Sequence, residues 1–128
     1  MMNISAAAKA SGLPTKTVRY YADVDLVPAP ARTEAGYRAY DEASVRTLIF
    51  VKRARDFGFS IEECRSLLGL YQDDHRTSAE VKSLAQKRLE EIEQKQRELQ
   101  SLKDELTRLV TACNGDHRPD CPIIDYLS

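Results

Sequence analysis

Apolar residues recur at a helical period along most of this chain, so the sequence predicts a mainly α protein. Ser5 is expected to cap a first short helix, which stops at Gly12. Thr15 is expected to cap a second helix through Tyr21, with Val18 facing inward. Two short helices joined by a tight turn are typical of a helix-turn-helix.

The segment after the second helix is predicted to form a small β-wing. Its prolines favour an extended path, and residues 32–38 are interpreted as two short arms around a turn at Gly36. Asp41 is then expected to cap a third helix, which ends at Gly58.

Two capping boxes indicate where the next helices begin. Ser60 and Glu63 open a helix with a broad apolar face, and Thr77 and Glu80 open another after a polar loop. From there to about Ala112 the chain has no glycine or proline. A single helix of about 36 residues, about 54 Å long, is therefore expected.

A narrow apolar seam follows this long helix at coiled-coil spacing. Its members are Ile92, Leu99, Leu102, Leu106 and Leu109. The remaining chain is too short to cover the seam, so an antiparallel coiled coil in a homodimer is favoured over an intramolecular hairpin. Residues 114–128 are expected to form a loop with a short apolar end.

The length of 128 residues fits one compact unit, or a small domain with an extended element, and excludes a large multidomain enzyme. Through Ser60 there are 9 Lys and Arg against 6 Asp and Glu, a charge of +3, which leaves −4 for the remainder. A basic head and an acidic tail suggest different partners. Without a targeting or membrane-spanning run, we expect a cytoplasmic protein, and without a catalytic motif we expect no enzyme.

The basic head has the composition of a DNA-binding surface, in which positive charge and rigid hydrogen-bond donors contact phosphates and bases. Ordinary surface charge is the alternative, because short helix pairs with Arg and Lys are common. The candidate residues on the second helix and the wing are Lys16, Thr17, Arg19, Tyr20, Arg32, Tyr37 and Arg38.

Several motifs in this chain resemble the MerR family of transcription regulators. They are Asn3-Ile4-Ser5, Val18-Arg19-Tyr20-Tyr21, Arg32 through Tyr40, and Phe57-Gly58-Phe59-Ser60. The resemblance covers essentially the whole chain and is closest to the copper-efflux branch, CueR/HmrR. It implies that Arg19, Tyr20, Tyr37 and Arg38 contact operator DNA. It also implies a dimeric activator that distorts double-stranded promoter DNA for RNA polymerase, with copper-efflux genes as targets.

Cys113 and Cys121 flank a loop in which Gly115 and Pro119 permit the chain to fold back. Two thiolates on such a loop suit the linear coordination of Cu(I), Ag(I) or Au(I), one ion per protomer. Zinc would require more ligands, for which His117 and His75 are the nearby candidates. Ordinary thiols and a reversible disulfide are the alternatives. Cys64 lies in phase with apolar residues and is expected to be a buried thiol.

Two thiolates with a monovalent ion carry a net charge of −1, which requires a counter-charge if the site is partly buried. Ser78, in the first turn of the long helix, lies where free N–H groups and the helix dipole supply positive potential, and Lys82 adds a full charge. An ordinary helix start is the alternative. The resemblance implies that the other subunit contributes Ser78, where divalent-metal sensors have cysteine.

The sequence thus predicts a mainly α copper(I)-responsive regulator, built from a winged helix-turn-helix head, a helical connector, a long dimerisation helix and a metal-binding loop. A thiol-redox or divalent-metal regulator and a copper buffer or chaperone are the alternatives. The expected divisions are a head with connector at 1–71, a linker at 72–77, a dimerisation helix at 78–112, and a metal-binding loop and tail at 113–128.

Overall fold

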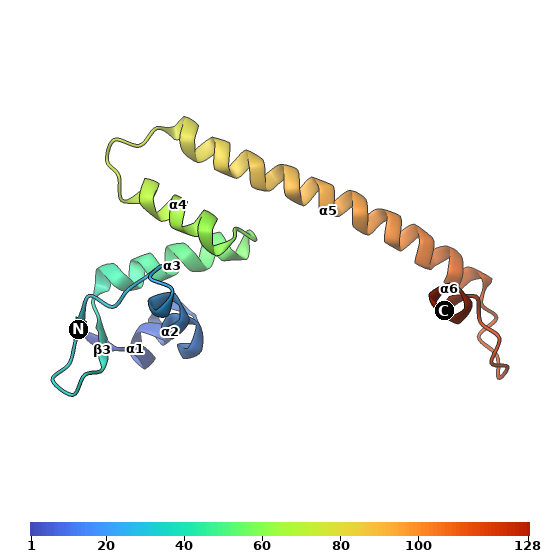
Figure 1. Cartoon of the computed structure of the whole chain (residues 1–128), viewed down its shortest axis with the longest axis horizontal. Helices are drawn as coiled ribbons and strands as arrows, with labels where there is room; N and C mark the ends of the chain where they lie inside the picture. The colour runs from blue at the N-terminus through green and yellow to red at the C-terminus, as the bar shows by residue number, and fades with distance from the viewer. The chain divides into compact units, whose positions relative to one another are not determined.

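The structure, a computed structural model, describes all 128 residues and divides them into two compact units, Met1–Ala85 and Gln86–Ser128. Six helices and three short strands make up the chain (Figure 1). In order they are β1 (Met2–Asn3), α1 (Ile4–Ser11), α2 (Thr15–Asp23), β2 (Ala31–Arg32), β3 (Arg38–Tyr40), α3 (Glu42–Asp56), α4 (Ile61–Tyr71), α5 (Ser78–Ala112) and α6 (Pro122–Leu127). The prediction of a mainly α fold with a small wing is confirmed.

The helix-turn-helix consists of α1 and α2, which pack against each other. The predicted cap at Ser5 is wrong, because Asn3 Oδ1 accepts the Ala6 N–H at 2.9 Å and α1 begins at Ile4. Gly12 ends α1 as predicted, in the left-handed conformation that glycine adopts without strain.

The second helix also differs at both ends from its prediction. Thr15 is its first residue and not its cap, since the capping position belongs to Pro14, which has no side-chain donor or acceptor. The helix continues beyond Tyr21 to Asp23. Val18 is fully buried, as the apolar pattern indicated.

The wing is a hairpin of β2 and β3, and its turn contains Gly36 with a positive φ, as predicted. A further strand, β1, was not predicted; it pairs with β3 and completes a three-stranded antiparallel sheet in the order β1-β3-β2. Two residues are too few to show a strand period. This pairing places the start of α1 beside the wing.

One apolar core holds the N-terminal unit together. It includes Val18 and Tyr21 of α2, Tyr40 of β3, Leu48 of α3 and Cys64 of α4. The caps at Asp41 and at the Ser60–Glu63 box are as predicted. Helices α3 and α4 pack side by side (Figure 1).

The long helix α5 is a single element of 35 residues, as predicted. Hydrogen bonds between Thr77 and Glu80 form the expected capping box. Much of its seam is exposed in one chain: Leu99, Leu102 and Leu106 are 63%, 66% and 54% exposed. Leu109 is different, because it is only 4% exposed and is covered within the C-terminal unit.

The expectation that the tail is a loop holds only in part, because its apolar end forms α6. Cys121 occupies the N-cap position and Pro122 follows at N1, where proline is favoured. The apolar sequence of this segment was too short to distinguish helix from loop. None of the helices has the combination of length and apolarity that a membrane span needs.

Replacement of Asn3 by Ala is expected to lower the free energy of unfolding by about 1 kcal/mol, because α1 loses its side-chain cap. Urea titration followed by circular dichroism measures this change. Ser5→Ala is the matched control and should change stability by less than about 0.5 kcal/mol, since Ser5 is an exposed helical residue. A larger loss for Ser5→Ala than for Asn3→Ala would contradict the assignment of the cap.

Candidate nucleic-acid interface and metal centre

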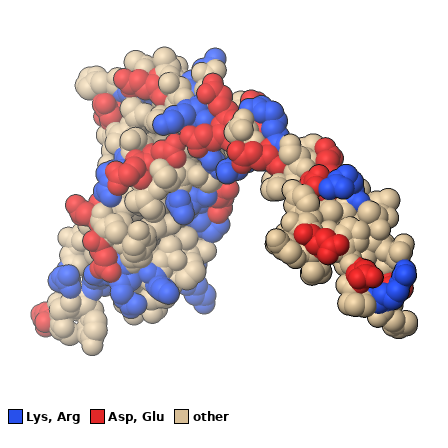
Figure 2. Space-filling view, turned by 45° about the vertical axis from the view of Figure 1, so that its right-hand side comes forward, with Lys and Arg blue, Asp and Glu red and all other residues tan.

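Basic side chains gather on one end of the N-terminal unit. Figure 2 shows Lys and Arg side chains together at the lower end of this unit, where Figure 1 has the wing and the first two helices. On α2, Lys16, Arg19 and Tyr20 are exposed, and on the wing Arg32 and Tyr37 are exposed. Such a surface offers several charged donors to a polyanion.

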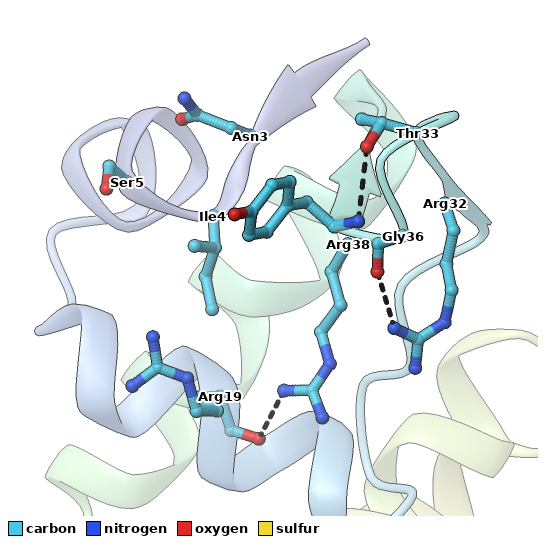
Figure 3. A pocket seen from close by; sticks show the side chains of 9 residues that line it. Asn3, Ile4, Ser5, Arg19, Arg32, Thr33, Gly36 and Arg38 are labelled. Atoms are coloured by element: carbon cyan, nitrogen blue, oxygen red, sulfur yellow. Dashed lines mark hydrogen bonds between the residues drawn. The ribbon is translucent and has the colours of Figure 1, made fainter.

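A groove with a volume of about 730 Å³ lies between the start of α1, the helix α2 and the wing. Figure 3 shows Arg19 on α2 and Arg32 and Arg38 on the wing around this groove. Tyr37 also lines it. Four of the seven predicted DNA-binding residues are therefore brought to one site.

The three other predicted residues, Lys16, Thr17 and Tyr20, do not line the groove and lie elsewhere on α2. Asn3 and Ser5 do line it, although the sequence analysis assigned them no binding role. The pairing of β1 with β3 brings them there. The motif Asn3-Ile4-Ser5 of the family resemblance marked these residues, but the pairing of β1 with β3 was needed to place them beside the wing.

Arg38 makes contacts within the chain that fix the wing to α2. Its Nη2 donates to Asp23 Oδ1 at 2.5 Å, and its Nη1 donates to the Arg19 carbonyl at 3.3 Å (Figure 3 shows the latter). The Arg38 side chain is only 24% exposed. An ion pair this close to solvent contributes little stability, but its two-sided geometry orients the wing.

The loop after α5 brings two thiols together. Cys113 follows the last residue of α5, Cys121 precedes α6, and their Sγ atoms are 3.4 Å apart. Gly115 has a φ of 63°, which turns the chain back as predicted. Asp116 accepts a hydrogen bond from the Arg118 backbone and pairs with its side chain, which stabilises the turn at the tip of the loop.

The two half-buried thiols of this loop differ chemically from the third cysteine. Hydrogen bonds from the backbone of Ile124, the Cys113 side chain and the backbone of Ile123 lower the pKa of the Cys121 thiol. Cys64 is fully buried, and desolvation raises the pKa of its thiol, as expected for a core residue.

Within this chain, no group of three or more His, Cys, Asp or Glu side chains is arranged so that it could hold a metal ion. His117 lies exposed in the loop between the two thiols. Ser78 and Lys82 lie in the first turns of α5 and belong to the N-terminal unit, whereas both thiols belong to the C-terminal unit. The thiol pair is therefore the candidate metal centre that one chain supplies.

The sequence is similar to known regulators along its whole length. Residues 2–70 match the MerR HTH family regulatory proteins, and residues 45–109 match the MerR DNA-binding family. The HTH-type transcriptional regulator HmrR of Rhizobium leguminosarum bv. viciae is 52% identical over 127 residues, which are 99% of this chain and 98% of that protein. The HTH-type transcriptional regulator CueR of Salmonella typhimurium is 45% identical, over 99% of this chain and 92% of that protein.

Among solved structures, the transcription regulator PbrR691 from Ralstonia metallidurans CH34, in complex with lead(II), matches with a TM-score of 0.84. It is 32% identical, and the match covers 100% of both chains. These relatives are regulators, so the prediction that this chain is not an enzyme is confirmed.

Cys121 is expected to react with iodoacetamide at neutral pH faster than Cys64, because its lowered pKa gives more thiolate and its side chain is accessible. Mass spectrometry of timed samples measures each site. The advantage should shrink as the pH falls and Cys121 becomes protonated. Unfolded protein is the control, in which all three cysteines should react alike, and equal rates in the folded protein would contradict the assignment.

Proposed function

Since this chain belongs to the MerR family of helix-turn-helix transcription regulators, we propose that it is a dimeric, metal-responsive regulator whose inducer is Cu(I). One observation carries the choice of metal: two thiols 3.4 Å apart on a closed loop, with no third ligand from the same chain. Ag(I) and Au(I) have the same ligand preference and are expected to act similarly.

The basic end of the N-terminal unit is the part that would bind promoter DNA. Arg19 and Tyr20 of α2 would face the major groove, and Lys16 and Thr17 would add contacts from the first turn of the same helix. Arg32 and Tyr37 on the wing, with Arg38 behind them, would contact the flanking phosphates. The roles of these side chains are inferred from their exposure and their chemistry.

The exposed stripe on α5 favours a second copy as its cover. An apolar stripe of Leu99, Leu102 and Leu106 in water is unfavourable, and an antiparallel pair of identical helices would bury it symmetrically. Such a dimer would present two heads to a pseudo-palindromic operator. The division into a head, a linker at 72–77, a dimerisation helix and a metal-binding loop follows from this arrangement.

The thiol pair suits a soft monovalent ion. If the zinc–thiolate length of about 2.3 Å is taken as a guide, two sulfurs on opposite sides of an ion would lie about 4.6 Å apart. The Sγ atoms of Cys113 and Cys121 would have to separate by roughly 1 Å, which side-chain rotation in a loop permits. A tetrahedral zinc site would need two further ligands, which this chain does not bring to the pair.

A bis-thiolate site with Cu(I) keeps one negative charge, and the start of α5 from a second copy is the proposed counter-charge. Helix α5 has 35 residues, with Ser78 at its first position and Cys113 directly after its last. In an antiparallel pair, the start of one helix lies beside the end of the other. Ser78 and Lys82 of the second copy would then approach the loop.

Metal binding would act by stabilising one dimer state over another, since a ligand shifts an equilibrium only by its differential affinity. The loop from Cys113 to Cys121 and the helix α6 that follows it are the proposed moving part. In the favoured state the two heads would distort the promoter and realign its elements for RNA polymerase. Genes for copper efflux are the expected targets.

A thiol-redox regulator is the second candidate, because the two Sγ atoms lie close enough to form a disulfide after a small movement. Such a switch would respond to an oxidant in the absence of metal. A copper buffer or chaperone is less consistent with membership of a regulator family.

The wild-type protein is expected to bind one Cu(I) per protomer tightly in anaerobic competition with a strong chelator. Cys113→Ser should lose this binding, because one sulfur cannot complete a two-coordinate site. His117→Ala is the matched control within the same loop and should bind as the wild type does. Tighter binding of zinc than of Cu(I) would overturn the choice of metal, and no tight metal would favour the redox switch.

Arg19→Ala is expected to weaken binding to a DNA duplex that the wild type selects from a randomised pool. Because Arg19 would face the major groove, the variant should also discriminate less between the selected duplex and a duplex of unrelated sequence. Arg97→Ala is the control, because it removes the same charge from the exposed surface of α5. Equal binding by the Arg19 variant and the wild type would contradict the proposed surface.

A further inference from the structure

Arg65 of α4 reaches across the N-terminal unit to the end of the second helix. Its Nη1 donates to the Asp25 carbonyl at 2.9 Å, and its Nη2 donates to the Val24 carbonyl at 3.0 Å. These partners lie 40 and 41 positions away in the sequence. The two arms of one guanidinium thus hold two consecutive backbone carbonyls.

These carbonyls lie where a helix has unsatisfied acceptors. Helix α2 ends at Asp23 with Val24 as its C-cap, and its last turn contains no basic residue. The C-terminal end of a helix carries a partial negative charge, which a nearby cation stabilises. Backbone N–H groups of residues 24–27 already serve carbonyls in the last turn of α2. Arg65 adds a positive charge and two donors at the carbonyls that follow them.

The turn that Arg65 holds contains backbone strain. Asp25 has a φ of 56° and is the only residue other than glycine with a positive φ in this chain. For a residue with a Cβ atom this conformation costs about 1 kcal/mol or more, and contacts must hold it. The same turn directs Leu26 and Val27 into the core, where both are buried.

Arg65 connects α4, which leads to the long helix, with α2, which belongs to the helix-turn-helix. Helix α4 packs against α3 and leads through residues 72–77 to α5, whereas α2 packs against α1. The two hydrogen bonds of Arg65 therefore connect α4 directly to the turn that ends α2.

We propose that Arg65 is a positioning residue for DNA binding, which clamps the C-terminal turn of the recognition helix α2 and ties its orientation to α4. Arg65 itself does not bind phosphate in this proposal. The ion pair with Glu62, at 3.6 Å on the surface of α4, is longer than the two carbonyl bonds and is secondary to them. The proposal rests on the proposed function for its DNA readout, but the clamp has a readout without DNA.

Hydrogen exchange of the free protein tests the clamp directly. In Arg65→Met, which keeps the apolar stem and removes the donors, the amides of residues 24–27 should exchange about tenfold faster. The amides of α3 should change less. Arg53→Met makes the same charge change on the exposed side of α3 and should leave residues 24–27 unchanged. Unaltered exchange in the Arg65 variant would overturn the proposal.

Binding to the duplex selected by the wild type tests the consequence. Arg65→Met should lower the affinity roughly tenfold with an unchanged salt slope, because no phosphate contact is lost. A slope reduced by about 1 would identify Arg65 as a phosphate contact and overturn the positioning role. If the wild type selects no duplex, the proposed function fails, and the exchange experiment still decides on the clamp.

Asp25→Gly distinguishes a clamp from general destabilisation. Glycine adopts the left-handed turn without strain, so the turn should keep its shape without Arg65. In the Asp25→Gly background, Arg65→Met should therefore cost only about two- to threefold in affinity. Equal losses in both backgrounds would overturn the proposal. If Arg65→Met does not fold, Arg65→Lys can be compared in the same two backgrounds. Lysine keeps the positive charge but lacks the planar guanidinium that makes two parallel hydrogen bonds.

Discussion

The shared core of the N-terminal unit is the interaction on which the rest of this structure depends. Val18, Tyr40, Leu48, Val51 and Cys64 are among its most completely buried side chains, and they come from the recognition helix, the wing and both connector helices. Each large apolar side chain buried there contributes about 1.5–3 kcal/mol. Because one core joins all four parts, α2 and the wing have a defined geometry, which a surface that reads DNA requires.

Hydrogen bonds from two arginines add to the packing of the core and join α2 to its neighbours. Arg38 joins the wing to α2 through Asp23 and the Arg19 carbonyl. Arg65 of α4 donates to the carbonyls of Val24 and Asp25, in the turn that follows α2. Neither arginine adds much stability near solvent, but each has directional donors that fix an angle between two elements. Both contacts therefore join α2 to a neighbouring element of the head, the wing in one case and α4 in the other.

The C-terminal unit brings two thiols together on one short loop. A loop of seven residues between two cysteines has a tip held by Asp116 and Arg118, and it brings two sulfurs to 3.4 Å. Two soft ligands without a third favour a soft monovalent ion over zinc. The exposed stripe of α5 and the charge left on such a site both favour a second copy of the chain, since one helix cannot place its own start beside its own end.

The sequence by itself determined most features that depend on neighbours three or four positions apart, although it misplaced the caps of α1 and α2 by one or two residues. The caps at Asp41, Ser60 and Thr77 and the unbroken helix α5 are all of this kind, because capping and helical periodicity are local. Only the tertiary structure decided the features that join distant positions. The pairing of β1 with β3, the partners of Arg38 and the clamp by Arg65 connect residues 15 to 41 positions apart. Such contacts exist only after the core has packed, so no local pattern in the chain encodes them.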